Sequence, residues 1–192
     1  MLSGVVRLFA VTLSVTLSLL FAPLPALARA SAIPAGGFLA LSYHEVSGDG
    51  QRDAAPGAGR HGVEVSHLIA QFTWLRENGY RPVSLAEVEK ARAGGKPLPP
   101  KAVLLSFDDG YADFHTRVYP VLKLFGYPAV IALVGSWMDA PAGAQVDYDG
   151  QKLPREAFMS WAQVREMVAS GLVEVASHSY ALHHGVLGNP QG

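Results

Sequence analysis

Apolar runs alternate with polar stretches of helical spacing along the chain from Gly37 onward. Four short apolar runs have the length and composition of buried strands, at 38–43, 102–107, 129–134 and 172–176. Between the first two runs, Leu68, Phe72 and Leu75 recur at the spacing that places them on one face of a helix. Strands and helices that alternate repeatedly predict a parallel α/β fold.

Local capping signals predict where the helices begin and end. Ser66 is expected to cap a helix that runs to about Asn78, and Ser84 forms a capping box with Glu87. Ser160 is expected to cap a third helix, which ends before Gly171.

Three other stretches are less regular. A helical stretch from Gly110 to Phe125 contains Pro120, which predicts a kink or the start of the helix's second half. The segments 47–62 and 136–155 are polar and contain glycine and proline, so they are interpreted as a loop and as an insertion.

The first 28 residues have the pattern of a secretory signal peptide. Arg7 precedes an uncharged apolar run from Leu8 to Ala22, and Ala26-Leu27-Ala28 supplies small residues for cleavage. The alternative is a retained anchor, although the run is short for a full membrane span. We therefore expect an exported protein, periplasmic or extracellular, that contacts the membrane only through residues 1–28 before cleavage. The folded domain is assigned to 29–192.

Composition excludes several classes of function. The 192-residue chain is 49% hydrophobic, which is enough for a globular core. Its formal net charge is −1, and it lacks the basic stripe of a nucleic-acid binder, so no nucleic-acid partner is expected. It has no cysteine, which excludes disulfides, thiolate nucleophiles and cysteine-ligated zinc.

Polar residues with catalytic potential follow directly after the predicted strands. They are His44, Asp108, Asp109 and His178. A (β/α) barrel collects its active site at the carboxyl ends of its strands. An open doubly wound sheet also binds ligands there, so this placement alone leaves both architectures open.

The Asp108–Asp109 pair admits two interpretations. Two adjacent carboxylates repel each other unless a cation lies beside them, and then one can bind a divalent metal while the other acts as a base. Gly110 permits a sharp turn next to the pair. Capping of the following helix explains the pair about equally well.

His178 and His183 shift the balance towards a metal site. One carboxylate and two imidazoles form a ligand set for an open zinc-like site whose fourth position takes water. The residue four positions after His178 is Leu182, so ligation by His183 requires a loop or a distorted turn. His184 is the competing ligand.

The sequence at 106–110 is Ser-Phe-Asp-Asp-Gly, and Tyr111-Ala112-Asp113 follows it. It resembles the first motif of the polysaccharide deacetylases, a carbohydrate esterase family that is also called the NodB-homology family. Ser-His-Ser at 177–179 resembles their second motif, and 124–129 resembles the turn into the next barrel strand. The resemblance extends from Leu39 to Gly192. It implies a (β/α) barrel of the polysaccharide deacetylase type, incomplete in this chain, and a metal-dependent hydrolase.

The resemblance also implies roles for individual residues. Asp108 would be the general base, and Asp109 and His178 would bind the metal. The five-residue spacing to His183 is similar to that of the subgroup that deacetylates poly-β-1,6-N-acetylglucosamine, a biofilm exopolysaccharide. In that subgroup's pattern, His183 would be the third ligand.

Two further residues have a functional and a structural interpretation. The pair Tyr43-His44 also resembles the sequence pattern of this subgroup. His44 would contact the substrate or the metal pocket, or else pack beneath the barrel mouth. Tyr111 would offer a backbone amide to the substrate's oxyanion, or else serve as a packing aromatic. The implied cofactor is one divalent metal ion, with zinc favoured and nickel, cobalt or iron as alternatives.

The implied reaction is metal-assisted hydrolysis of an acetamide, with Asp108 taking a proton and acetate leaving. The expected partner is a polysaccharide. The alternatives are chitin, peptidoglycan or another acetylated glycan as substrate, and a non-catalytic carbohydrate-binding module of the same fold. The family's later motifs have no counterpart before Gly192, so the general acid and any downstream domain are expected outside this chain.

Overall fold

The computed structural model describes residues 33–34, 36–50, 62–148 and 150–183. The segment with the signal-peptide pattern, 1–28, lies outside the described residues, as does His184. No helix in the described part of the chain is both long enough and apolar enough to cross a membrane.

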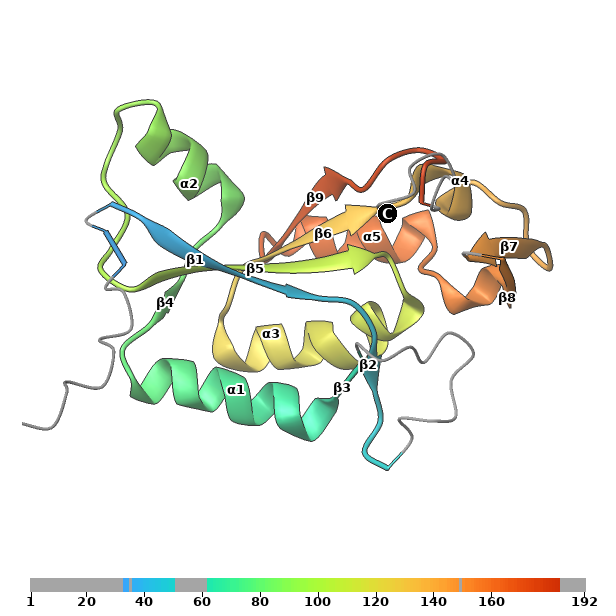
Figure 1. Ribbon diagram of the computed structural model, residues 1–192, viewed down its shortest axis with the longest axis horizontal. Coiled ribbons are helices and arrows are strands. Elements are labelled where there is room, and N and C mark those ends of the chain that lie inside the picture. Colours follow the sequence, from blue (N-terminus) through green and yellow to red (C-terminus); the bar gives the residue numbers. More distant parts are fainter. Residues whose placement is uncertain (1–32, 35, 51–61, 149, 184–192) are drawn as a thin grey trace, which may run out of the picture. The chain divides into compact units, whose positions relative to one another are not determined.

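A sheet of five parallel strands organises the described residues (Figure 1). Its members are β1 (Phe38–Tyr43), β4 (Arg81–Pro82), β5 (Ala102–Asp109), β6 (Ala129–Leu133) and β9 (Val173–Ser177). The order is β1-β5-β6-β9, and the short β4 pairs with the start of β5 while β6 pairs with its end. Over the described residues the sheet stays open, with β1 and β9 at its edges.

This sheet confirms the parallel α/β fold and all four predicted long strands. The main difference lies at the end of β5, which continues through Asp109 rather than ending at Phe107. The extension matters because it places the acidic pair on the strand itself, where pairing with β6 fixes both residues.

The helices and the short strands fill the connections between these five strands. The helices are α1 (Val65–Glu77), α2 (Leu85–Arg92), the π-helical turn η1 (Phe114–Val118), α3 (Tyr119–Phe125), α4 (Gly135–Met138), the 3₁₀ turn η2 (Arg155–Ala157) and α5 (Trp161–Ala169). The short strands are β2 (Val46–Ser47), β3 (Val63–Glu64), and the antiparallel pair β7 (Gln145–Tyr148) and β8 (Gln151–Pro154).

Helix boundaries agree with two of the three predicted caps. Ser84 with Glu87 and Ser160 with Gln163 each form a full capping box. The prediction for Ser66 is wrong, because the N-cap of α1 is Glu64, two residues earlier, and the helix begins at Val65. The Ser66 amide instead donates to the Asp49 carboxylate at 3.0 Å, so an acid from a distant loop satisfies the exposed end of α1.

Alternate residues of β5 face two different environments. Val103, Leu105 and Phe107 are buried in the main core, which they form with side chains of α1, α3 and α5. Ser106 and Asp108 point to the opposite side of the strand and are only partly buried. The predicted buried strand is therefore fully buried on one face, whereas the end of its other face is only partly buried.

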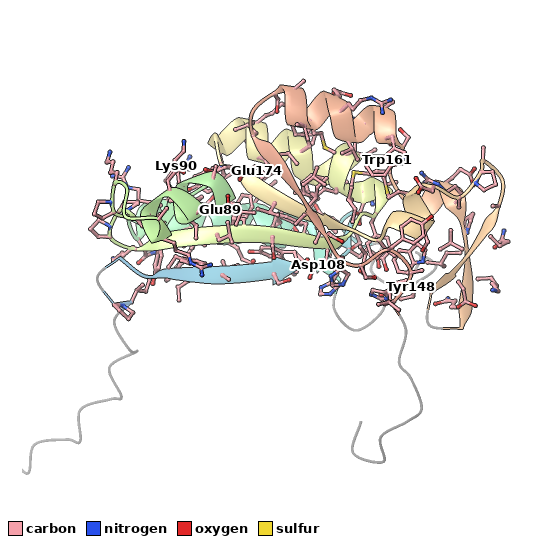
Figure 2. The ribbon with its side chains drawn as sticks, turned by 90° about the horizontal axis from the view of Figure 1, so that it is seen from above. Glu89, Lys90, Asp108, Tyr148, Trp161 and Glu174 are labelled. Atoms are coloured by element: carbon pink, nitrogen blue, oxygen red, sulfur yellow. The ribbon has the colours of Figure 1, made fainter. Side chains whose placement is uncertain are left out.

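The second face of the sheet carries α2 at one end. Figure 1 shows α1 and α3 side by side below the sheet and α2 above it. Glu174 of β9 holds α2 there, because its carboxylate accepts hydrogen bonds from the Leu85 and Ala86 amides at 2.6 and 3.0 Å. In Figure 2, Asp108 and Tyr148 lie at one end of the sheet, and Glu89 and Lys90 of α2 lie at the other.

The segment interpreted as an irregular insertion, 136–155, contains α4 and the β7–β8 hairpin. Arg155 holds it together from the inside. Its buried guanidinium donates to the carbonyl oxygens of Met138 and Met159, both at 2.8 Å, and to those of Ala140 and Phe158. Because the Met159 amide in turn donates to the Gly110 carbonyl at 2.9 Å, Arg155 connects this segment to the end of β5.

We expect Arg155→Met to lower the free energy of unfolding by about 3–5 kcal/mol. The thioether fills part of the space but leaves four carbonyl oxygens without this donor, three of them in buried hydrogen bonds. Arg165→Met, at an exposed position of α5, is the matched control and should change the free energy by less than about 0.5 kcal/mol. Urea denaturation of both variants measures the difference. Equal effects of the two substitutions would contradict the role of Arg155.

Candidate active site

The end of β5 turns through two consecutive left-handed residues. Asp109 has φ 73° and Gly110 has φ 84°, and the Gly110 amide donates to the Asp108 carbonyl at 2.9 Å. A β-carbon on Gly110 would lie 2.7 Å from Cδ2 of Leu133, so glycine is required there by both conformation and space. Aspartate tolerates the left-handed region better than most residues, but it still needs stabilising contacts there.

This turn separates the two acids by environment. The side chain of Asp109 is 0% exposed, whereas that of Asp108 is 17% exposed. Asp108 accepts a hydrogen bond from the Ser42 hydroxyl at 3.0 Å, and Nε2 of His44 lies 3.9 Å from the same carboxylate oxygen. The partly exposed acid therefore faces β1 and the residue that follows it, while its neighbour points into the protein.

Asp109 lies next to two histidines. Oδ1 of Asp109 is 3.1 Å from Nε2 of His183 and 3.6 Å from Nε2 of His178. One ligand atom from each of these three residues can be chosen so that all three lie within 4.8 Å of one another. The three residues are called the Asp–His–His cluster below.

Sheet order explains how residues so distant in sequence meet. β6 lies between β5 and β9, and the His178 amide donates to the Leu133 carbonyl at 2.9 Å, which continues the β6–β9 pairing. Ser179 then adopts φ 93°, so the chain leaves the strand direction directly after His178. This irregular turn brings His183 back to Asp109, in agreement with the expectation that its approach needs a loop rather than a helix.

The cluster fits a divalent cation. Within the described residues, neither carboxylate oxygen of Asp109 has a hydrogen-bond partner, although both are buried. Burial raises the pKa of Asp109, the nearby His183, His44 and His178 lower it, and Asp108 raises it. A buried carboxylate without donors is costly, and a cation held by one carboxylate and two imidazoles would remove that cost.

Aromatic rings support the cluster from the side of the inserted segment. The His183 ring lies 4.7 Å from the Trp137 ring and stacks on Tyr148 at 5.3 Å. Tyr111 stacks on Phe158 at 5.4 Å, and burial raises the pKa of its hydroxyl. The Tyr111 side chain is thus a packing aromatic, and the proposed role of its backbone amide stays a prediction.

Trp137, Tyr148 and Phe158 were not among the predicted site residues. The available signal was the presence of three aromatics within and just after a polar insertion. It was too weak to place Trp137 and Tyr148 beside His183, because the contact of Tyr148 depends on the folding of the β7–β8 hairpin.

A clamp on Val46 fixes the segment that carries His44. The Val46 amide donates to Asp113 at 2.6 Å, and Arg117 donates to the Val46 carbonyl at 3.2 Å. Asp113 and Arg117 lie four residues apart around η1. Because His44 precedes Val46 by two residues, this clamp contributes to the position of His44 near Asp108.

His115 does not belong to the Asp–His–His cluster. Its ring contacts Glu166 at 3.1 Å and Gln163 at 3.3 Å, both on α5. His184, the predicted competitor of His183, is outside the described residues.

Residues 95–188 match the polysaccharide deacetylase family. These residues belong to that family. The match spans β5, β6, β9 and the whole Asp–His–His cluster.

A curated relative supports the assignment. The poly-β-1,6-N-acetyl-D-glucosamine N-deacetylase of Escherichia coli K12 is 50% identical over 159 residues, which are 83% of this chain and 23% of the relative. The chain thus spans about a quarter of that relative's length.

Two solved structures are also similar. The de-N-acetylase from Aggregatibacter actinomycetemcomitans has a TM-score of 0.73 at 46% identity. The BpsB deacetylase domain from Bordetella bronchiseptica has a TM-score of 0.66 at 44% identity. Each match covers 81% of this chain and 59% of the solved chain. These neighbours confirm the predicted fold of the polysaccharide deacetylase type, of which the described residues contain an open, parallel part of the sheet.

We expect Asp113→Asn to change how stability depends on pH. Burial raises the pKa of Asp113 from 3.8 to about 7, the Val46 amide lowers it, the Glu45 carboxylate raises it, and Arg117 lowers it. An acid whose pKa is higher in the folded state destabilises that state as it ionises. Wild-type stability should therefore fall, relative to Asp113→Asn, by up to about 4 kcal/mol between pH 4 and 7 and stay level above.

Urea denaturation across this pH range measures the difference between the two proteins. Both contain the Asp–His–His cluster, so its titration cancels in the comparison. Asp139→Asn removes an exposed carboxylate and should follow the wild-type slope. Parallel curves for wild type and Asp113→Asn would show that Asp113 is not held in its neutral form.

Proposed function

We propose that this protein is a metal-dependent N-deacetylase of poly-β-1,6-N-acetyl-D-glucosamine. The observation that carries the proposal is the buried Asp109 carboxylate, which has no hydrogen-bond partner in the described residues and lies 3.1 and 3.6 Å from two imidazole nitrogens. The substrate is taken from the name of the 50%-identical Escherichia coli relative. The protein acts as a hydrolase of the amide bond that joins acetate to the sugar nitrogen.

Asp109, His178 and His183 would hold one divalent metal ion. The carboxylate supplies one oxygen ligand and the two neutral imidazoles supply two nitrogen ligands. Such a ligand set favours zinc, with nickel, cobalt or iron as alternatives. When bound, the metal would act as a Lewis acid on the acetamide carbonyl and lower the pKa of a bound water. A cation held there would compensate for the burial of the Asp109 carboxylate without hydrogen-bond donors.

Asp108 is proposed as the general base. It is adjacent to the cluster, is partly exposed, and keeps one fixed orientation through the Ser42 hydroxyl. Asp108 takes a proton from the water that attacks the acetamide carbon. The carbon–nitrogen bond then breaks, giving acetate and an amino sugar, and the nitrogen gains a proton.

His44 is proposed as a substrate-binding residue. Its side chain is 39% exposed and its Nε2 lies 3.9 Å from Asp108, so it borders the space in which the water and the acetamide would meet. The backbone amide of Tyr111 is proposed as a donor to the oxyanion, because Tyr111 follows the acidic turn directly.

The proposed location is periplasmic or extracellular, where an exported polysaccharide is available. The support for this location is the signal-peptide pattern of 1–28. The polysaccharide is the proposed partner.

We expect Asp108→Asn to lower kcat for acetate release from poly-β-1,6-N-acetyl-D-glucosamine by about 10²–10⁴-fold. The amide keeps the acceptor for Ser42 but cannot take the proton. Metal content should stay at the wild-type level, since Asp108 is not a proposed ligand. Asp139→Asn is the control and should keep full activity. Undiminished acetate release by Asp108→Asn would rule out its role as base.

Metal content distinguishes His183 from His184. We expect His183→Ala to lose most of its bound metal and His184→Ala to retain about one equivalent, because Nε2 of His183 lies 3.1 Å from Oδ1 of Asp109 and completes the cluster with His178. Elemental analysis after dialysis measures both, and His115→Ala serves as a second control away from the cluster. Metal loss in His184→Ala with retention in His183→Ala would reverse the assignment.

A further inference from the structure

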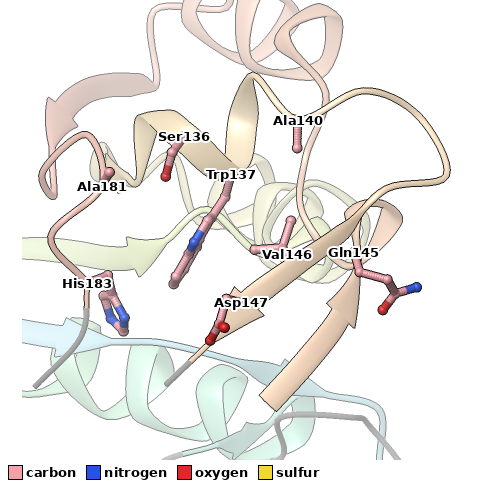
Figure 3. Close-up of a pocket in the computed structure, with 8 residues that line it drawn as sticks. All are labelled: Ser136, Trp137, Ala140, Gln145, Val146, Asp147, Ala181 and His183. Atoms are coloured by element: carbon pink, nitrogen blue, oxygen red, sulfur yellow. The ribbon is translucent and has the colours of Figure 1, made fainter. Parts of the chain in front are cut away.

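Cavities at the two ends of the parallel strands differ in their lining. One, of about 440 Å³, lies between α4, β7 and His183, so it belongs to the candidate active site (Figure 3). The other, of about 400 Å³, is lined by Arg76, 79–82, Gly126 and Tyr127, and is called the basic cavity below. Figure 1 shows its elements, the end of α1, β4 and the turn between α3 and β6, at the amino ends of the strands. It is therefore remote from the Asp–His–His cluster, which lies at the carboxyl ends.

Two arginines line the basic cavity without an acidic counterpart. None of its described lining residues is aspartate or glutamate. Neither Arg76 nor Arg81 forms an ion pair within the described part of the chain. Lys101 adds a third cation, because its Nζ lies 5.4 Å from the ring centroid of Tyr80, which is itself a lining residue.

The helix ends at this cavity account for only part of the positive charge. α1 is capped at Asn78 and α3 at Gly126, and each helix end carries about half a negative charge. Arg76, Arg81 and Lys101 together carry three positive charges, so an excess of about two remains. An anion with about two negative charges would balance this excess.

The two guanidinium groups are suited to an oxyanion. Cζ of Arg76 lies 4.9 Å from the centroid of the Phe125 ring, a cation–π contact that restricts the plane of the group. Burial raises the pKa of the Tyr127 hydroxyl and Arg76 lowers it, which agrees with a charge that faces the cavity. The Arg81 side chain is exposed, and its N–H groups have no acceptor in the described residues. Arginine N–H groups form paired hydrogen bonds with phosphate oxygens.

Backbone hydrogen bonds hold the walls of the basic cavity in place. The Tyr80 amide donates to the Leu75 carbonyl at 2.9 Å, and the Arg81 amide donates to the Lys101 carbonyl at 2.9 Å. On the opposite wall, the Tyr127 amide donates to the Leu122 carbonyl at 3.1 Å. A cavity that is formed before the ligand arrives loses little conformational entropy on binding.

We propose that the basic cavity binds the phosphate group of a small phosphorylated molecule. A phosphate monoester carries about 1.5 to 2 negative charges at pH 7, which matches the excess positive charge better than a carboxylate does. The volume lies within the range of about 300–1,000 Å³ that small-molecule sites occupy, so it has room for the organic part of the ester. Tyr80, stacked on Trp74 at 5.5 Å, offers that part an aromatic surface.

Calorimetric titration of the full-length protein with glycerol 3-phosphate tests the proposal. The ionic strength is held constant with sodium chloride, because exposed charge pairs are screened by salt. We expect one saturable site in wild type and an affinity at least about tenfold lower in Arg81→Gln. Arg81→Lys keeps the charge but loses the paired donors, so its affinity should lie between the two.

Arg165→Gln is the matched control. It removes the same charge from an exposed position on α5 that does not line the cavity, and should bind within about twofold of wild type. Urea denaturation of Arg81→Gln should give the wild-type midpoint, since the Arg81 side chain has no hydrogen-bond partner in the described residues. Absence of saturable binding to wild type, or equal affinities in wild type and Arg81→Gln, would overturn the proposal.

Phosphate also binds metal ions, so the titration is repeated after chelator treatment. Binding at the basic cavity should persist, and loss of binding together with the metal would overturn the proposal. Glycerate, which presents a carboxylate in place of the phosphate, should bind about tenfold more weakly than glycerol 3-phosphate. Equal affinities for the two would overturn the assignment to phosphate.

Vesicles of phosphatidylglycerol distinguish a soluble phosphate ester from a lipid headgroup. They present the same chemical group on a membrane surface, and vesicles of phosphatidylcholine serve as the control without net charge. We expect glycerol 3-phosphate to bind whether or not the protein co-sediments with either type of vesicle. Co-sedimentation with phosphatidylglycerol vesicles in the absence of binding to glycerol 3-phosphate would overturn the assignment to a small molecule.

Discussion

The buried carboxylate of Asp109 is the constraint on which the rest of the site depends. It sits at a left-handed position, fully buried, with no hydrogen-bond donor in the described part of the chain. Each of these features costs free energy, and together they would be unfavourable in a residue that only capped a helix. The two imidazoles at 3.1 and 3.6 Å would complete a ligand set for a cation, and a bound cation would offset that free-energy cost.

The turn that buries Asp109 also separates it from Asp108. If both acids shared one environment, their charges would repel and neither would have a distinct role. The left-handed conformation of Asp109 and Gly110 directs one carboxylate inward and leaves the other partly exposed beside Ser42 and His44. The proposed division of labour between ligand and base follows from this geometry. Gly110 is needed for it, because the Leu133 side chain leaves no space for a β-carbon.

The surrounding elements hold this geometry from two sides. On the side of β1, Asp113 and Arg117 bind the backbone of Val46 and so fix the segment that carries His44. On the other side, Arg155 binds two carbonyl oxygens of the inserted segment and two of the residues just after it. The segment's aromatic rings contact His183. The same segment forms part of the wall of the cavity beside the cluster.

Much of this arrangement could be predicted from local sequence. The four apolar runs became parallel strands, the capping boxes at Ser84 and Ser160 formed as expected, and the family resemblance at 106–110 and 177–179 agreed with the family match. These features depend on short-range patterns of burial and hydrogen bonding, which a sequence expresses directly. The prediction that Ser66 caps α1 failed because Asp49, seventeen positions away, satisfies that helix end instead.

What the sequence by itself determined was the list of chemical groups and the strand ends that carry them. It left open whether the acidic pair was a cap or a site, and it did not indicate that Trp137 and Tyr148 flank His183. The tertiary structure decided both points. The burial of Asp109, its distance to each histidine, and the cavity at β7 depend on the order β5-β6-β9 and on a hairpin packed against it. Contacts between residues so far apart in the chain arise only when the sheet is assembled, so no local pattern could have specified them.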